Sequence, residues 1–480
     1  MKSIKNKVFG RSKEDSVLKS LLKSNKSEFI AVYGRRRVGK TYFLRETLKS
    51  SGYSYFDISG QKKAPRTQQL QNFTLAFQQK FSPEHALSTP KTWNEAFESV
   101  TKEIKKSKKT FIFLIDELPW LCGQKSGCYE ALDYYWNKEW SLIPYFKLIV
   151  CGSAAAWMIE KIINAKGGLH NRITYSMLMQ PFDLLQTKDY LEGQGFRYTT
   201  DQTIRIQMCF GGIPYYLSLL KPSLSDGQNI DQLFYSSDSP LFDEFEKLFE
   251  SLFEHHRDHQ RIVQILAKKR IGMNSSELLK ATQMSSGGTF QKRLVELEKS
   301  GFIQSRVPLG RKKKETTFFF TDEYSFFYLT WIKDSKKIQS QLKQKNFWSQ
   351  QFQKPEWYSW AGYCFESLVM KNFNWVQTQL HLDGLIKNMG PLRVKGAQID
   401  LLLERTDGVA HIIEIKYHQN KFEITKEYSL QLKNKIHSVI QHYKEKKQIL
   451  LSVVTLNGFK ENNWSHGIVD SSVALKDLLK

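Results

Sequence analysis

The sequence predicts a multidomain α/β protein that begins with a parallel sheet flanked by helices. Its 480 residues exceed a typical domain of roughly 100–200 residues, so about three or four domains are expected. A hydrophobic fraction of 41% and an aromatic fraction of 13% are sufficient to build buried cores. In residues 1–185, short apolar strands alternate with helical stretches, which is the pattern of parallel strands joined by crossover helices.

The later parts of the chain have different patterns. The strands expected in the first domain are Phe29–Tyr33, Tyr53–Ile58, Phe111–Ile115 and Lys147–Cys151. Residues 186–255 have helical periodicity that is interrupted at FGGIPYYLSLL, and we expect a small helical lid there. Residues 256–332 predict three helices and a hairpin, residues 333–350 a basic helical linker, and residues 351–480 a smaller α/β domain.

The charge of the chain favours an anionic partner. Seventy-one Lys and Arg residues against forty-eight Asp and Glu give a net charge of +23, with a pI near 9.5. Such an excess attracts polyanions, of which nucleic acid is the commonest for a soluble protein, and we favour DNA. The alternative is a generally basic proteome, which composition alone does not exclude.

Cysteine usage and hydropathy point to the cytoplasm. The five cysteines show no paired metal-binding spacing and no disulfide framework, so we expect reduced thiols. The N-terminus lacks the apolar segment of a signal peptide. The longest apolar runs, such as FIFLI, are too short to span a bilayer, so no membrane association is expected.

A glycine-rich loop between a strand and a helix carries the strongest chemical signal. The segment FIAVYGRRRVGKTYFL contains Gly34, then Gly39-Lys40-Thr41 after four intervening residues. Glycines let backbone N–H groups turn around a phosphate, and the following helix adds its positive N-terminal dipole. In such a P-loop Lys40 would reach the β- and γ-phosphates of ATP, and the Thr41 hydroxyl would ligate Mg²⁺.

An acidic pair ends a second apolar strand, in FIFLIDELPWL. Asp116 is positioned to hold the Mg²⁺ shell, and Glu117 to orient or deprotonate an attacking water. The strand KLIVCGS ends at Ser153, which either senses the γ-phosphate or only caps the next helix. Arg172 is a candidate for phosphate contact in cis or from a neighbouring subunit of a homo-oligomer, or it is a plain surface arginine.

These segments together resemble the archaeal-type P-loop ATPase family in the AAA+/STAND neighbourhood. The resemblance rests on GRRRVGKT, IDELPWL, VCGS, QPFDLLQTKDYL and FGGIPYYL, and it covers about the first half of the chain. It implies an ATPase core with a helical lid. The opening FGRSKEDSVLKSLL also resembles the family's entry segment, which would put Phe9-Gly10-Arg11 near the adenine.

The segment after the lid predicts a winged helix. Three short helices precede the strand FIQSRVPLG, a basic turn and the strand TTFFFTD. Phe290, Leu294 and Leu297 recur at helical spacing and should face the core. The residues available for phosphates are Lys292, Arg293, Arg311, Lys312, Lys313 and Lys314. Because Glu296 and Glu298 would repel DNA, a protein-binding role for this module stays open.

A second cluster of catalytic residue types lies in AQIDLLLERTDGVAHIIEIKYH. Glu414 and Lys416 are two residues apart on one strand, so they share a face. A two-residue turn would place Asp400 opposite Ile415, whereas a three-residue turn, 406–408, would place it opposite Glu414. We predict the second register, because only it makes two carboxylates converge as hard-oxygen ligands for Mg²⁺. A neighbouring lysine would polarise a scissile phosphate.

This Asp…Glu-x-Lys arrangement resembles the PD-(D/E)xK nuclease core over about the last 130 residues of the chain. The resemblance implies a further metal-site residue, Glu366, on the preceding helix, and a basic amphipathic helix in QLKNKIHSVIQHY. The sequence departs from the family in lacking a proline before Asp400. The alternatives are a surface hairpin with an incidental Glu–Lys pair, or a nuclease fold that has lost activity.

The complete expectation is a P-loop ATPase core with a parallel sheet and helical lid, a winged helix, and a C-terminal α/β restriction-endonuclease-like domain. ATP binding around Asp116, Glu117 and Arg172 would reposition the C-terminal domain on DNA, which we state as a hypothesis. The competing hypothesis is an ATP-dependent regulatory or signalling switch whose winged helix and C-terminal domain bind a partner or nucleic acid without cleavage.

Overall fold

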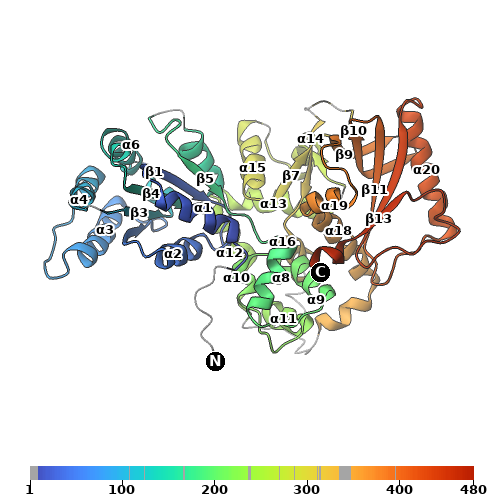
Figure 1. The fold of residues 1–480 in the computed structure, drawn as a ribbon, viewed down its shortest axis with the longest axis horizontal. Helices are drawn as coiled ribbons and strands as arrows, with labels where there is room; N and C mark the ends of the chain where they lie inside the picture. The colour runs from blue at the N-terminus through green and yellow to red at the C-terminus, as the bar shows by residue number, and fades with distance from the viewer. Residues whose placement is uncertain are drawn as a thin grey trace. The chain divides into compact units, whose positions relative to one another are not determined.

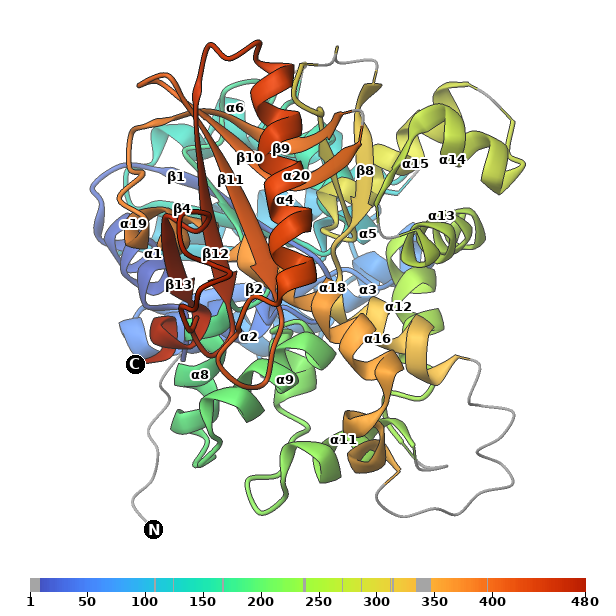
Figure 2. The same cartoon turned by 90° about the vertical axis from the view of Figure 1, so that its right-hand side faces the viewer.

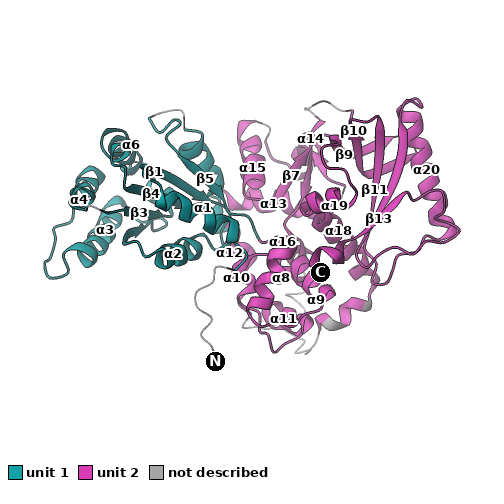
Figure 3. Cartoon of the chain, viewed as in Figure 1, with its two compact units in different colours: residues 1–181, 250–254 teal, residues 182–249, 255–480 magenta. Residues whose placement is uncertain are grey.

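The structure is a computed structural model in which the chain divides into two compact units, coloured separately in Figure 3. Unit 1 comprises Met1–Pro181 and Glu250–Glu254, and unit 2 comprises Phe182–Phe249 and His255–Lys480. The described residues are 9–107, 109–123, 125–165, 168–235, 239–269, 271–285, 287–310, 312, 315–333, 347–394 and 396–480.

Unit 1 is built on a five-stranded sheet in the order β2-β3-β4-β1-β5, in which all paired strands are parallel. The strands are β1 (Glu28–Tyr33), β2 (Tyr55–Ser59), β3 (Phe111–Asp116), β4 (Phe146–Gly152) and β5 (Tyr175–Leu178). The first four confirm the strands expected from the sequence. Strand β5 was not expected, because three of its four side chains are exposed and it has no continuous apolar run.

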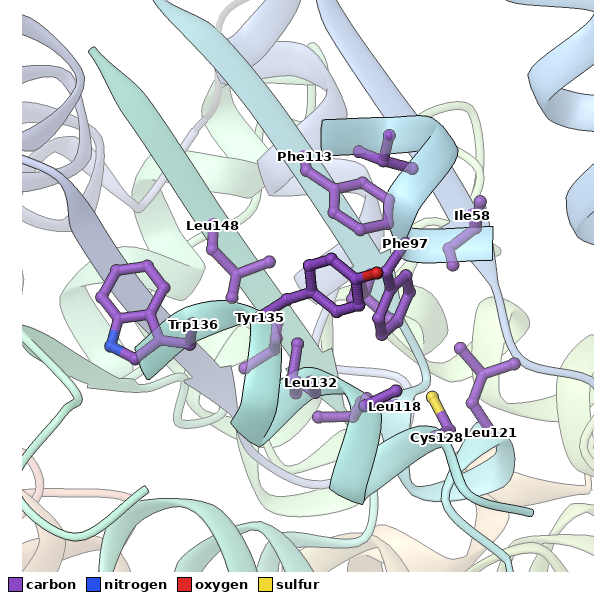
Figure 4. Packing of buried hydrophobic residues seen from close by; sticks show 14 of the residues in the cluster. Ile58, Phe97, Phe113, Leu118, Leu121, Cys128, Leu132, Tyr135, Trp136 and Leu148 are labelled. Carbon is purple, nitrogen blue, oxygen red and sulfur yellow. The ribbon is translucent and has the colours of Figure 1, made fainter. Parts of the chain in front are cut away.

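Helices cover the sheet of unit 1 and bury its apolar side chains. They are α1 (Ser12–Lys23), α2 (Lys40–Ser51), α3 (Arg66–Phe81), α4 (Trp93–Lys106), α5 (Leu118–Leu121), α6 (Cys128–Lys138) and α7 (Ala155–Trp157), with η1 (Trp140–Leu142) and η2 (Met158–Ile163). Figure 4 shows part of this core, where Phe97 of α4 and Trp136 of α6 lie over Phe113 and Leu148 of the sheet. Thr92 caps α4 by accepting a hydrogen bond from the Glu95 amide, which fixes where that helix begins.

Unit 2 begins with short helices. They are α8 (Leu184–Gly193), α9 (Thr200–Phe210), α10 (Pro214–Leu217), α11 (Asp226–Phe234) and α12 (Glu244–Leu252), whose last residues, from Glu250 on, are counted with unit 1. Asp183, Thr199 and Ser225 each form a capping box with a glutamine three residues later, so the local sequence sets three of these helix starts. The helical character expected for residues 186–255 is therefore present.

The next segment has the expected three helices and hairpin. Its elements are α13 (His256–Lys268), β6 (Met273–Asn274), α14 (Ser275–Thr282), α15 (Gly288–Lys299), β7 (Ile303–Arg306) and β8 (Thr317–Phe320), with the sheet order β6-β8-β7. Phe290, Leu294 and Leu297 are buried, as their helical spacing predicts. Arg311, Lys313 and Lys314 lie outside the described residues, as does most of the expected linker at 333–350.

The C-terminal part of unit 2 is a five-stranded mixed sheet in the order β13-β12-β11-β10-β9. Its strands are β9 (Ile386–Val394), β10 (Ala397–Arg405), β11 (Val409–Lys416), β12 (Gln448–Thr455) and β13 (Ser471–Ala474), and its helices are α18 (Pro355–Lys371), α19 (Phe373–Gln379) and α20 (Lys426–His442), with η6 (Leu475–Leu479). Figures 1 and 2 show α20 lying along the sheet, where Leu432 and Val439 join a core with Leu402 and Ile412. Helix α18 contacts β11, and its Phe365 ring packs on Tyr417.

One aromatic core joins the segments of unit 2 that the sequence pattern separates. It is formed by η4 (Tyr328–Ile332), η5 (Trp348–Gln353), α16 (Glu323–Phe327), α10 and α18. The Tyr216 ring lies 4.5 Å from Tyr324, and Phe327 lies 4.9 Å from Trp348 and 5.7 Å from Trp360. Because buried aromatic pairs contribute a large share of packing energy, these contacts stabilise the packing of the segments against one another. No helix in the described part of the chain is both long and apolar enough to pass through a bilayer.

A buried histidine makes the stability of unit 2 depend on pH. His411 of β11 is 3% exposed, and its ring hydrogen-bonds the Ser452 hydroxyl at 2.7 Å. Burial, and secondarily the positive charge of Arg405, lower the pKa of His411 to about 4. In the unfolded chain His411 is protonated below about pH 6.5, whereas in the folded chain it stays neutral until about pH 4. The contribution of the neutral His411 to the free energy of unfolding is therefore fully present above pH 6.5 and is lost as the pH falls toward 4.

We therefore expect wild-type unit 2 to lose about 2 kcal/mol more unfolding free energy between pH 7 and pH 5 than His411→Gln, which keeps a hydrogen-bonding group but does not titrate. Denaturant-dependent hydrogen exchange of the β11 amides measures this difference. Equal pH dependence in the two proteins would show that folding does not lower the pKa of His411.

Candidate functional site

The P-loop connects β1 to α2 through backbone conformations that favour glycine. Gly34 has φ +148°, and a Cβ added there would lie 2.3 Å from the Met179 carbonyl oxygen. Gly39 has φ +84° and precedes the first turn of α2. Both expected glycines are therefore required by geometry, and the N-terminus of α2 points its free amides at the loop.

Lys40 and Thr41 lie inside this loop with defined partners. Lys40 is 5% exposed, and its ammonium donates to the carbonyls of Gly34 (2.9 Å) and Arg35 (3.0 Å). The Thr41 hydroxyl donates to the Asp116 carboxylate at 2.8 Å, so the end of β3 touches the start of α2. A hydroxyl and a carboxylate at this spacing are hard oxygen donors suited to Mg²⁺.

Glu117 and Ser153 are brought together at the neighbouring strand ends. Both the Ser153 amide (3.0 Å) and its hydroxyl (2.9 Å) donate to one Glu117 carboxylate oxygen. Ser153 does not cap the next helix, because α7 follows Ala154 with no side-chain cap, so that alternative is wrong. Glu117 has a left-handed backbone (φ +48°), which is uncommon for a residue with a side chain and typical of strained functional positions.

Arg172 is placed away from the P-loop, which corrects the expectation of a contact in cis. It precedes β5, and β5 runs parallel to β1 with Tyr175 opposite Ile30. Arg172 therefore lies at the amino edge of the sheet, whereas the P-loop follows its carboxyl edge. Strands rise roughly 3.3 Å per residue, so β1 separates the two by about 15–20 Å. The side chain is exposed, so only contact with another molecule stays open.

Arg11 joins the P-loop in a way that the sequence pattern did not reveal. Arg11 is 3% exposed, and its guanidinium donates to the carbonyls of Val38 (3.4 Å) and Gln180 (2.5 Å). The entry segment thus contacts the loop through Arg11, and a position of Phe9-Gly10-Arg11 near the adenine stays a prediction. The role of Arg11 in holding the loop backbone has no local sequence signal.

The C-terminal hairpin has the register that brings two carboxylates together. Leu401 pairs with Ile413 and Leu403 with His411, which aligns Asp400 with Glu414 one step further along. The turn is the three-residue one, with Gly408 at φ +84°. The predicted register is confirmed, and the two-residue alternative that places Asp400 opposite Ile415 is excluded.

Glu414 is buried at 1% exposure and is held by three donors. Lys416 (3.0 Å) and Lys435 of α20 (2.8 Å) form ion pairs with its carboxylate, and the Tyr428 hydroxyl donates to the same group. Burial raises the pKa of Glu414, but the two lysines outweigh it and leave the pKa below its usual value. Sequence analysis missed Lys435 and Tyr428, because their approach depends on how α20 crosses the sheet.

Glu366 and Asp400 complete the cluster with Lys416. Burial raises the pKa of Glu366 to about 7, and the negative charge of Asp400 adds to the effect. Burial also raises the pKa of Asp400, with Glu414 contributing in the same direction. Like charges therefore crowd this site, as they do where a cation is bound. Yet among the described residues no set of three or more His, Cys, Asp or Glu side chains is arranged to hold a metal.

The phosphate-binding residues expected on α15 divide into two groups. The Lys292 side chain is 67% exposed and accessible. Arg293 is buried and its Nε donates to Asp258 at 2.7 Å, so it is not available for phosphates, which corrects the expectation. Glu296 pairs with His259 (2.8 Å) and Glu298 accepts from the Ser305 amide (2.7 Å), so both glutamates have partners within the module.

Comparison with known proteins supports the first part of this description. Residues 8–220 match the family described as "ATPase domain predominantly from Archaea". An uncharacterized protein of Methanocaldococcus jannaschii is 24% identical over 423 residues, covering 86% of this chain and 88% of the relative. The solved Walker-type ATPase of Pyrococcus abyssi has a similar fold, with a TM-score of 0.50 at 18% identity over 67% of this chain and 96% of that one.

A weaker likeness is to the ORC2 protein of Aeropyrum pernix, solved in ADPNP–ADP complexes. Its TM-score is 0.44 at 14% identity, over 69% of this chain and 94% of that one. The family match and the P-loop geometry agree with each other. The chain is thus a multidomain α/β protein with a parallel-sheet P-loop core, and its residues 8–220 match an archaeal-type ATPase domain, a match that implies nucleotide binding.

Proposed function

We propose that the chain hydrolyses ATP in an AAA+/STAND-like ATPase domain and that this hydrolysis controls a C-terminal, Mg²⁺-dependent nuclease-like domain acting on DNA. The observation that carries the ATPase half is the P-loop with its Thr41–Asp116 hydrogen bond, inside a segment that matches an ATPase family. The nuclease half rests on the register that aligns Asp400 with Glu414.

In the nucleotide site, the amides around Gly34 and Gly39 would cradle the phosphates, and Lys40 would leave its two carbonyl partners to pair with them. Thr41 and Asp116 are the oxygen donors that would hold Mg²⁺, which neutralises charge on the phosphate oxygens when bound.

Glu117 would then orient and deprotonate the attacking water. Its carboxylate is occupied by Ser153 in this structure, so the hydroxyl is suited to hold the glutamate and to respond to the γ-phosphate. The expected role of Ser153 as a sensor gains support from this contact, because the two groups share one hydrogen-bond network.

Two variants should affect ATP binding and ATP hydrolysis differently. Lys40→Ala should weaken ATP binding by roughly tenfold or more, because it removes a charge-assisted contact to phosphate. Glu117→Gln should keep binding while hydrolysis falls about 10²–10⁴-fold, the usual contribution of a general base. Nucleotide binding by calorimetry and phosphate release measure the two effects.

The matched control is Lys49→Ala, on the same helix, with a side chain 57% exposed and paired with Glu46. It should leave both measurements at the wild-type level. If Lys40→Ala behaved like this control, the P-loop would not be the nucleotide site.

In the C-terminal site, Asp400, Glu414 and Glu366 would hold Mg²⁺, which supplies Lewis-acid activation of the scissile phosphate when bound. The raised pKa of Glu366 supports this, because crowded carboxylates are relieved by a cation. Lys416 lies beside the carboxylates and would neutralise charge on the phosphate.

A second candidate function has its own supporting observation. Glu414 already has three donors, and among the described residues no three-ligand metal set is assembled. Both facts favour a regulatory or signalling switch in which the winged helix and the C-terminal domain bind a protein partner or nucleic acid without cutting it.

Cleavage by one carboxylate variant distinguishes the two candidates. Asp400→Asn should reduce Mg²⁺-dependent DNA cleavage to the background of a gel assay, because it removes a charged ligand without changing shape. Asp407→Asn, at the exposed turn between the same two strands, is the control and should cleave normally. If the wild-type chain did not cleave DNA, the regulatory or signalling switch would be favoured. If Lys40→Ala cleaved DNA as fast as the wild type in the presence of ATP, control of cleavage by ATP would be contradicted.

A further inference from the structure

A cavity of about 440 Å³ in unit 2 has one wall from the nuclease-like domain and the other from the winged-helix segment. Glu366, Asp400 and Lys416 line the first wall, and Arg306 and Phe319 of the β7–β8 hairpin line the second. Figures 1 and 2 both show this hairpin beside β9. The carboxylates therefore face another part of the chain across the cavity.

The two walls are held together by direct contacts. The Leu309 amide donates to the Pro391 carbonyl at 3.2 Å, and the Tyr363 hydroxyl donates to the Phe320 carbonyl at 2.9 Å. The Phe326 and Tyr363 rings, 4.8 Å apart, continue this contact into the aromatic core. Because these groups are packed and hydrogen-bonded, the hairpin is a fixed wall of the cavity.

Two arginines bring positive charge into the cavity without a carboxylate partner. Arg306 lies over the Phe319 ring at 5.1 Å and donates to the Gln304 side chain at 2.8 Å, and Arg393 donates to the Ile271 carbonyl at 3.0 Å. Across the described ranges, neither guanidinium forms an ion pair with Asp or Glu. Arg306 is half-buried, and this burial lowers the pKa of its guanidinium. An anion in the cavity would relieve the cost of this burial.

The size and lining of the cavity identify the anion. Its volume lies in the range of roughly 300–1,000 Å³ that holds ligands of nucleotide size, and a double helix does not fit in such a space. Tyr358 is 43% exposed at the cavity, and Phe319 also presents its ring there. Aromatic rings beside cationic groups are the usual surface for unpaired bases and their backbone.

We propose that this cavity binds an unpaired DNA segment or a frayed strand end, with a phosphate held by Arg306 and Arg393 and a base stacked against Phe319 or Tyr358. The winged-helix segment is then one wall of the nuclease-like site. The cleavage chemistry rests on the proposed function, but the binding of the strand does not.

Fluorescence anisotropy with the full chain in EDTA tests this binding. The probes are a labelled twelve-nucleotide oligo-dT and a blunt hairpin duplex that carries the same label. We expect oligo-dT to bind about tenfold tighter than the duplex, and Arg306→Ala and Arg393→Ala each to weaken oligo-dT binding about tenfold. The slope of log K against log salt should fall by about 0.7 in each variant, the value for one phosphate contact on a single strand.

Arg261→Ala is the control, because Arg261 is an exposed arginine of α13 outside the cavity. It should bind oligo-dT as the wild type does. Arg393 is also exposed, so its variant reports on binding even if Arg306→Ala lowers the thermal midpoint of the protein. Equal affinity for both probes, or arginine variants that bind like the control, overturns the inference.

Cleavage in Mg²⁺ separates this inference from the proposed function. If oligo-dT binds through the two arginines but is not cleaved, the assignment of the cavity as a single-strand site stands and the nuclease proposal is wrong. If cleavage is lost in Asp400→Asn but unchanged in Arg306→Ala and Arg393→Ala, the nuclease proposal stands and the cavity is not the single-strand site.

Discussion

The parallel pairing of β3, β4 and β1 is the constraint on which the nucleotide site depends. Parallel strands end at the same edge, so Tyr33, Asp116 and Gly152 finish their strands side by side. That edge receives the P-loop, the acidic pair and Ser153, although 75 residues separate Thr41 from Asp116 and a further 36 separate Glu117 from Ser153. The parallel pairing of β5 with β1 puts Arg172 at the other edge, about the length of β1 away from the loop.

Local signals predicted the strands, the loop and the acidic pair at this edge, because each depends on a short segment. The loop glycines follow from backbone geometry, and Asp116 follows from the end of an apolar strand. Residues that act through tertiary packing were not predicted. Arg11 reaches Val38 across the sheet edge, and Arg293, an apparently free basic residue, is buried against Asp258. A sequence gives the charge of such residues but not their partners.

In the C-terminal hairpin, the predicted strand register depends on whether the turn has two or three residues. A Thr-Asp-Gly turn is compatible with two registers, and a shift of one residue sends every side chain to the opposite face. The left-handed conformation of Gly408 selects the register that aligns Asp400 with Glu414. The approach of Lys435 and Tyr428 from α20 could not be predicted, because it depends on the angle at which a helix crosses the strands.

The two candidate sites differ in what a cation has to displace. In the nucleotide site, the Thr41 hydroxyl donates a single hydrogen bond to Asp116, and a bound Mg²⁺ would have only this contact to displace. In the C-terminal site, Lys416 and Lys435 already neutralise Glu414, so a cation must compete with two buried ion pairs.

A substrate phosphate would change the competition between a cation and Lys416 for Glu414, because Lys416 could then pair with the phosphate. The Glu414 carboxylate would thereby become available to the cation. Under the proposed function, phosphate entry and Mg²⁺ binding at Glu414 are therefore coupled, since each is more favourable when the other is present. Arg306 and Arg393, which also line the cavity, would favour the entry of the phosphate. The resting state, with Glu414 held by its three donors, is accordingly compatible with a nuclease-like site that assembles only around its substrate.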